Sequence, residues 1–267
     1  MRFDVITLFP ELFAPFLSHG INRRAFESRQ VDVRLWQLRD FAEGNYRRVD
    51  DRPFGGGPGM VMQPDPLYRC WQAIHADRSA GRGADQPEAQ PVPTVLFSPL
   101  GERLAHPVVE RFCADAGAIL ICGRYEGLDQ RFIDACVDIQ ISLGDFVLSG
   151  GEIPAMALLD SVARLQPGVL NDAGSHQQDS FNPALDGLLD CPHYTRPEVW
   201  SGPRGDAPVP AVLLSGHHGQ IEAWRRQQRL RQTAQWRPDV LGQVRAQGDL
   251  SAADEKWLRA AALDKSV

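Results

Sequence analysis

Residues 118–165 decide the fold, and they read AILICGRYEGLDQRFIDACVDIQISLGDFVLSGGEIPAMALLDSVARL. Apolar runs at 118–122 and 137–142 predict two buried strands. Residues 128–135, which lie between them, predict a helix, and residues 152–165 predict an amphipathic helix. This alternation of strand and helix is typical of a parallel sheet whose strands are joined by crossover helices.

More strands and helices are predicted on the N-terminal side of this stretch. Strands are expected at 3–8, 31–36 and 94–97, and helices at 66–76 and 107–116. We therefore predict the α/β class. Ligands of such sheets bind at the carboxyl ends of the strands, so the loops that follow the strands are the expected site.

The composition predicts two domains. A first domain is expected over residues 1–168, a polar linker over 169–180, and a small, mainly helical domain over 181–267. Residues 78–93 are rich in Gly, Ala, Pro and Gln, which predicts a flexible surface insertion. Near the C-terminus, Ser251 followed by Asp254 predicts a capping box at the start of the last helix.

Composition excludes several classes of protein. The 267 residues carry a net charge of −6, so any contact with RNA must come from a local basic patch. Lys256 and Lys265 are the only lysines, which excludes a P-loop lysine or a Schiff-base lysine in the body of the chain. The five cysteines include no Cys-x-x-Cys pair, which argues against disulfides and zinc. No apolar run suits a signal peptide or a membrane span, so we expect a cytoplasmic location.

Three glycine-containing loops are candidate sites. Residues 50–60 read DDRPFGGGPGM. This is not a P-loop, because no lysine follows, and not G-x-G-x-x-G, because Met60 stands where the third glycine would be, so a structural loop is the preferred interpretation. Residues 143–152 read LGDFVLSGGE, which suits either a backbone-lined ligand site or a plain strand-to-helix turn. Residues 123–127 read GRYEG and place a carboxylate on a strand-end loop, which favours function over packing.

Two further segments carry candidate RNA contacts. Residues 188–197 read LLDCPHYTRP, whose prolines indicate a rigid loop. A helix is predicted over residues 219–231. In it Arg225, Arg226 and Arg229 fall on one side, and we call these three the basic face. The basic face suits either phosphate contacts or a solvated surface.

The order of these motifs along the chain is more specific than any one of them. Eight motifs follow one another in the sequence, in this order: DDRPFGGGPGM, SPLG, GRYEG, SLGDFVLSGGE, DSVARLQPGVL, DSF, LLDCPHYTRPEVW and PAVLLSGHH. In this the chain resembles the bacterial tRNA (guanine-N1)-methyltransferase family of the SPOUT superfamily over nearly its whole length. The resemblance implies a SPOUT-type parallel sheet with a C-terminal trefoil knot, a helical tRNA-binding domain and a homodimer. It also implies methylation of guanosine 37 of tRNA, next to the anticodon, with S-adenosylmethionine as the methyl donor and Mg²⁺ assisting.

The resemblance assigns site residues position by position. Cofactor contacts are expected at Leu96, Ser98, Pro99, Gly123, Tyr125, Glu126, Leu143, Gly144, Asp145, Phe146, Val147, Leu148, Gly150, Gly151 and Pro154. Contacts to tRNA are expected at Asp50, Ser175, His193, Arg196, Arg225, Arg226 and Arg229. The chain departs from the family at Phe146, where tyrosine is common, and at Asn182-Pro-Ala, a short insertion.

The resemblance also implies two catalytic residues. Asp179 of the DSF motif matches the general base, and Arg164 matches the residue that supports the target base. A carboxylate can take the N1 proton of guanine, and a guanidinium can stabilise the charge left on O6. Alternatively, Asp179 caps a helix that begins at Ser180 or Phe181, and Glu126 is then the next candidate base. Two rival functions are a Rossmann-type methyltransferase and a non-catalytic RNA-binding module.

Overall fold

The computed structural model describes residues 1–80, 92–170 and 175–261. The chain forms two compact units, Met1–Asn171 and Asp172–Val267. The first unit contains a five-stranded sheet in the order β2-β1-β6-β5-β7, and every neighbouring pair is parallel. The strands are β1 (Arg2–Thr7), β2 (Asp32–Gln37), β5 (Thr94–Arg103), β6 (Gly117–Ile121) and β7 (Ile139–Ser142). The predicted α/β class with a parallel sheet is confirmed.

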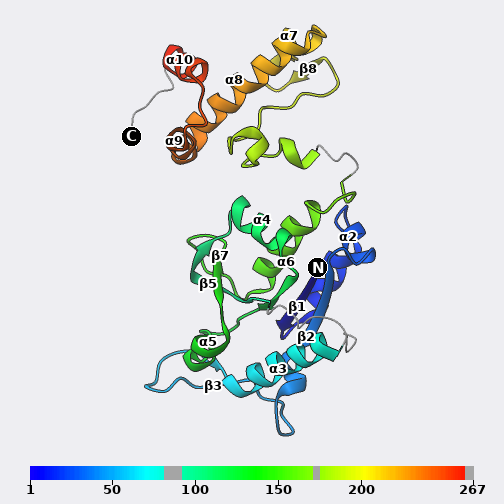
Figure 1. Cartoon of the computed structure of the whole chain (residues 1–267), viewed down its shortest axis with the longest axis vertical. Helices are drawn as coiled ribbons and strands as arrows, with labels where there is room; N and C mark the ends of the chain where they lie inside the picture. The colour runs from blue at the N-terminus through cyan, green and yellow to red at the C-terminus, as the bar shows by residue number, and fades with distance from the viewer. Residues whose placement is uncertain (81–91, 171–174, 262–267) are drawn as a thin grey trace. The chain divides into compact units, whose positions relative to one another are not determined.

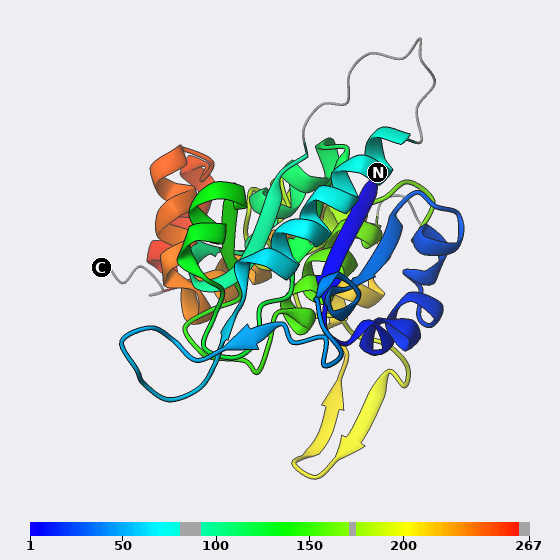
Figure 2. The same cartoon turned by 90° about the horizontal axis from the view of Figure 1, so that it is seen from below.

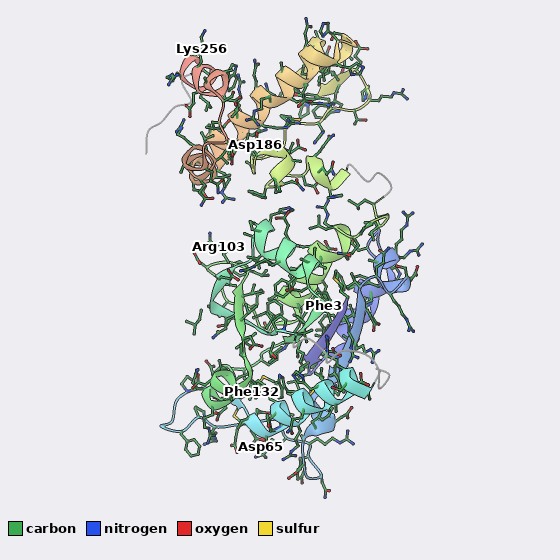
Figure 3. All side chains as sticks on the ribbon, in the orientation of Figure 1. Phe3, Asp65, Arg103, Phe132, Asp186 and Lys256 are labelled. Atoms are coloured by element: carbon green, nitrogen blue, oxygen red, sulfur yellow. The ribbon has the colours of Figure 1, made fainter. Side chains whose placement is uncertain are left out.

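Helices cover both faces of the sheet (Figure 1), so its central strands are apolar on both sides. One face packs against α1 (Ala14–Ser18), α2 (Arg23–Glu27), α4 (His106–Ala114) and α6 (Glu152–Arg164). The other face packs against α3 (Pro64–Ala80), which crosses the strands in Figure 2, and α5 (Gln130–Cys136). Phe3 and Phe132, labelled in Figure 3, belong to the two cores on these opposite faces.

The second half of β5 passes along the outer flank of β7. Ile141 pairs with both Phe97 and Glu102 of β5. A strand residue has two edges, so these two partners lie on opposite sides of β7. A Cβ at Gly101 would collide with the backbone of Gln140, which shows how closely the β5 backbone passes.

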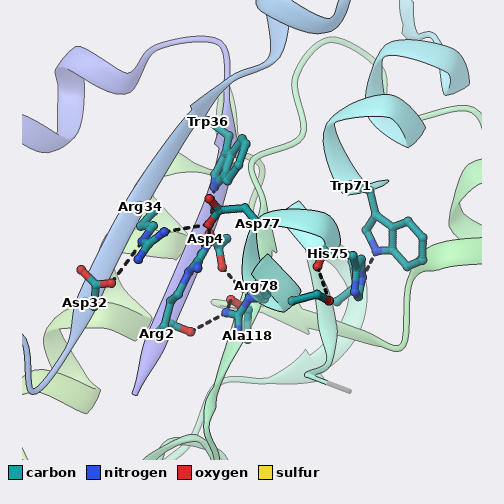
Figure 4. A network of polar contacts seen from close by, with 12 residues as sticks. Arg2, Asp4, Asp32, Arg34, Trp36, Trp71, His75, Asp77, Arg78 and Ala118 are labelled. Atoms are coloured by element: carbon teal, nitrogen blue, oxygen red, sulfur yellow. Dashed lines mark hydrogen bonds and ion pairs between the residues drawn. The ribbon is translucent and has the colours of Figure 1, made fainter. Parts of the chain in front are cut away.

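A buried polar cluster ties the start of β1 to the end of α3 (Figure 4). Asp4 is fully buried and accepts hydrogen bonds from Arg2 (2.6 Å), from Trp36 Nε1 (2.8 Å) and from Arg78 Nε (2.6 Å). Asp77 lies at the exposed side of the cluster and pairs with Arg2 and Arg34. The predicted start of the surface insertion at residue 78 was therefore wrong, because Arg78 belongs to α3 and is held by Asp4. Residues 81–91 of that insertion lie outside the described residues.

The second unit has its own small core. After two 3-10 turns, η3 (Ser175–Gln178) and η4 (Pro183–Leu185), come the strands β8 (Val199–Gly202) and β9 (Gly205–Pro208). The helices are α7 (Ala211–Leu214), α8 (His218–Trp236), α9 (Pro238–Gln247) and α10 (Ala252–Ala260). Leu188, Leu230 and Leu258 are fully buried at the centre. The predicted capping box of Ser251 and Asp254 is confirmed, whereas the hairpin of β8 and β9 was not predicted.

Two general expectations can be compared with the structure. All five cysteines are free thiols, as their spacing predicts. Among the described residues, no helix is long and apolar enough to cross a membrane.

Candidate active site

The loops after β5, β6 and β7 meet around one pocket of about 510 Å³. Its wall contains the predicted cofactor residues Leu96, Ser98, Pro99, Gly123, Tyr125, Glu126, Leu143, Gly144, Phe146, Val147, Leu148, Gly150, Gly151 and Pro154. Asp145 is the predicted residue that does not line this pocket, since its side chain is 92% exposed and pairs with Arg103. Parallel strands bring these loops together because their carboxyl ends lie at the same edge of the sheet.

The pocket also contains residues that the sequence did not single out. Arg124 follows β6, Gln140 lies on β7, and Gln130 begins α5. The side-chain oxygen of Gln140 is buried and has no hydrogen-bond partner within the described part of the chain. A buried acceptor of this kind requires a donor, which a ligand in the pocket can supply. Nothing in the periodicity distinguishes Gln140 from other strand residues.

The glycine-rich loop at 50–60 packs beside the pocket. It is closed by the short strands β3 (Asp50–Asp51) and β4 (Val61–Met62). The amide of Glu126 donates to the carbonyl of Met60 at 3.0 Å, and a Cβ at Gly59 would collide with the Glu126 side chain. Burial, together with the charge of Asp50 and a hydrogen bond to it, raises the pKa of Tyr125. Asp50 therefore lies beside Tyr125, a residue of the pocket wall, and its contact with tRNA stays a prediction.

The loop at 143–151 needs its last two glycines, Gly150 and Gly151, because it passes close to the residues that follow β6. We call these two residues the glycine pair. A Cβ at Gly151 would lie 2.6 Å from Cα of Cys122, and a Cβ at Gly150 would collide with the Arg124 side chain. The amide of Gly151 donates to the carbonyl of Gly123 at 3.0 Å. This loop is therefore joined to the end of β6, which brings two of the three pocket walls together.

The Gly151→Ala substitution should destabilise the first unit by about 1–3 kcal/mol, because the new methyl group can be accommodated only by moving the β6 backbone. Urea denaturation measures the change in the free energy of unfolding. Gly242→Ala is the matched control, since Gly242 lies in α9 with nothing within 4 Å of its added Cβ. That change should instead stabilise α9 by up to about 1 kcal/mol. Equal stability of wild type and Gly151→Ala would contradict the close approach.

Cysteine chemistry does not suit this pocket. Cys122 is buried beneath the glycine pair, and burial raises the pKa of its thiol well above the ordinary value. Burial likewise raises the pKa of Cys113 to about 11. Both thiols are neutral at physiological pH, and a neutral thiol is a poor nucleophile.

The two predicted catalytic residues lie in different units. Arg164 is the last residue of α6 and is half-buried. Asp179 is half-buried in the turn between η3 and η4, where its amide donates to the carbonyl of His176. The next 3-10 turn begins at Pro183 and is capped by Asn182. The alternative that Asp179 caps a helix at Ser180 or Phe181 is therefore wrong.

The predicted tRNA contacts of the second unit differ in accessibility. Arg226 pairs with Asp186 at 2.6 Å and with Asp254 at 3.0 Å. Arg229 is buried and pairs with Glu222 at 2.9 Å. Arg225 is the most accessible member of the basic face, with its side chain 43% exposed.

The other three predicted contacts of the second unit lie outside the basic face. His193 is exposed and lies 2.7 Å from a carboxylate oxygen of Asp190. Arg196 is exposed in the loop before β8. Ser175 begins η3, and its side chain lies outside the described residues.

Comparison with known proteins gives the same family as the sequence motifs. A family model described as tRNA (Guanine-1)-methyltransferase TrmD matches residues 1–243. A protein of Paracidovorax citrulli named tRNA (guanine-N(1)-)-methyltransferase is 68% identical, and the match covers 97% of each chain. Proteins with the same name from Polaromonas sp. and Albidiferax ferrireducens are each 67% identical, over 97% of this chain and 96% and 98% of theirs. The chain belongs to the tRNA (guanine-1)-methyltransferase family.

Proposed function

We propose that this protein transfers a methyl group from S-adenosylmethionine to N1 of guanosine 37 in tRNA, next to the anticodon. The names of its relatives support the reaction, and the family supports the position and the methyl donor. The observation that carries the proposal is the pocket, because loops from three strands bring nearly all the predicted cofactor residues to one place.

The pocket fits the proposed cofactor in size and chemistry. Its volume of about 510 Å³ falls in the range of small-molecule sites. Gly144, Gly150 and Gly151 line the pocket without side chains, which leaves room for a flat heterocycle, and Gln140 offers a buried acceptor without a partner among the described residues. When bound, S-adenosylmethionine supplies a methyl group on a positively charged sulfur.

The protein's own residues then act on the guanine. Its N1 atom carries a proton and is a poor nucleophile until that proton leaves. The carboxylate of Asp179 accepts it, which is expected to accelerate the reaction on the order of 10²–10⁴-fold. The permanently charged guanidinium of Arg164 stabilises the negative charge on O6. A guanine in a loop can be unstacked at least cost.

Several finer features of the family are part of the proposal. The backbone that passes on both sides of β7 supports the trefoil knot. Residues 1–168 then form the catalytic domain, residues 169–180 the linker, and residues 181–267 the helical tRNA-binding domain. Two copies would form a homodimer with shared active sites, as the family implies.

Magnesium is implied by the family alone. Within residues 1–80, 92–170 and 175–261, no three His, Cys, Asp or Glu side chains are grouped to hold a metal ion. Mg²⁺ is usually bound by one or two carboxylates together with substrate groups, and Glu126 is the candidate contact.

Arg225→Ala should weaken tRNA binding and reduce the slope of log affinity against log salt by about one, because one phosphate contact is lost. Binding titrations at several salt concentrations measure the slope. Arg225→Lys keeps the charge and should keep the slope. An unchanged slope in Arg225→Ala would show that this part of the basic face is solvated surface.

One assay tests the proposed function as a whole. The protein is incubated with S-adenosylmethionine labelled on its methyl group and with unmodified tRNA, and the labelled nucleoside is identified. The expected product is 1-methylguanosine at position 37. Binding of tRNA without transfer would indicate an RNA-binding module, and transfer to another substrate class would indicate a different methyltransferase.

A further inference from the structure

Glu152 is a buried carboxylate that the proposed chemistry does not use. It is the first residue of α6, directly after the glycine pair, and its side chain is 2% exposed. One carboxylate oxygen accepts hydrogen bonds from Thr7 Oγ1 at 2.9 Å and from Arg124 Nε at 3.2 Å. The other lies 2.8 Å from Nη2 of Arg124 and makes no hydrogen bond of good geometry with any described residue. Such a buried charge is costly unless a cation compensates it.

Arg124 is that cation, and it lines the pocket. Its Nη1 atom donates to the carbonyl of Ser149 at 3.1 Å, and its guanidinium lies 4.6 Å from the ring centroid of Phe9. Arg124 therefore joins the GRYEG loop to the 143–151 loop and to α6. Its side chain is 20% exposed, so its charge acts on whatever occupies the pocket.

The proposed cofactor makes this charge important. S-adenosylmethionine carries a sulfonium, an ammonium and a carboxylate, so its net charge is positive. Its demethylated product has a neutral sulfur and no net charge. An uncompensated guanidinium in the pocket wall would therefore repel the methyl donor but not the product.

We propose that Glu152 is a positioning residue that neutralises Arg124 and thereby allows the pocket to take a cationic ligand. This inference rests on the proposed cofactor. A pocket of about 510 Å³ is roughly 10 Å across, so a unit charge in its wall lies within reach of any bound atom. At that distance the expected change in relative affinity is roughly threefold to tenfold.

Calorimetry on the full chain tests the inference with three ligands. They are S-adenosylmethionine, its neutral product S-adenosylhomocysteine, and sinefungin, which carries an amine in place of the methylated sulfur. Glu152→Gln should weaken the two cationic ligands more than the neutral one, by roughly threefold to tenfold. Arg124→Gln should have the opposite effect and strengthen the two cationic ligands relative to the neutral one. The double variant should restore the wild-type ratio of cationic to neutral ligand affinity, even if looser loops weaken the binding of all three ligands.

The controls separate charge from structure. Thr7→Val removes a hydrogen bond to Glu152 without changing any charge, so it should leave the ratio unchanged. If Glu152→Gln does not fold, Arg124→Gln and the double variant still provide the comparison. Equal weakening of all three ligands by Glu152→Gln would overturn this inference alone. A wild-type protein that binds none of them would overturn the proposed cofactor as well.

Discussion

Asp179→Asn is expected to bind S-adenosylmethionine with nearly wild-type affinity and to transfer the methyl group at least about 10²-fold more slowly. Asparagine has the size and shape of aspartate but cannot accept the N1 proton at neutral pH. Asp179 does not line the described pocket, so its loss should leave cofactor binding almost unchanged. Single-turnover transfer measures the rate, and calorimetry measures the affinity.

A control for this variant is Asp249→Asn. Asp249 is exposed beyond the end of α9 and has no proposed part in the reaction, so its rate should match wild type. Transfer by Asp179→Asn within threefold of wild type would remove Asp179 as the base. Glu126, in the pocket wall, would then be the next candidate.

Asp4→Asn is expected to lower the free energy of unfolding by about 3 kcal/mol. The substitution leaves Arg2 and Arg78, whose side chains are only 17% and 13% exposed, without their shared carboxylate. A partly buried cation that loses its carboxylate partner lowers the stability of the folded state. The β1 backbone itself is unchanged. Urea denaturation followed by circular dichroism measures the loss.

Asp77→Asn is the matched control within the same cluster. Asp77 is 42% exposed and also pairs with two arginines, but water can replace it. Its loss should change stability by less than about 1 kcal/mol. Equal losses from Asp4→Asn and Asp77→Asn would show that burial does not distinguish these two carboxylates.

The sequence predicted the sheet but not the polar contacts that join its parts. Apolar runs such as 118–122 mark a strand because burial on both faces leaves no room for polar side chains. The bond between Arg78 and Asp4 joins residues 74 positions apart, and that between Arg124 and Glu152 joins residues 28 apart. No local pattern encodes such pairs.

The candidate site could be predicted only through the family, which the order of the motifs identifies. The pocket residues follow from the resemblance, whereas Gln140 has no motif and became evident only from its buried, unpartnered oxygen. The hairpin of β8 and β9 was missed because its strands are short, mostly exposed and bounded by glycine and proline, so they lack an alternating apolar pattern.

The path of β5 around β7 has a consequence for solubility. Open sheet edges can pair with the strands of other molecules, which is a route to aggregation. The outer edge of β7 is already occupied by Glu102 and Arg103 of β5, so it offers few unpaired backbone groups. In the described part of the sheet, β2 is then the edge that remains open to such pairing. Its charged residues Asp32 and Arg34 are the kind that discourage it.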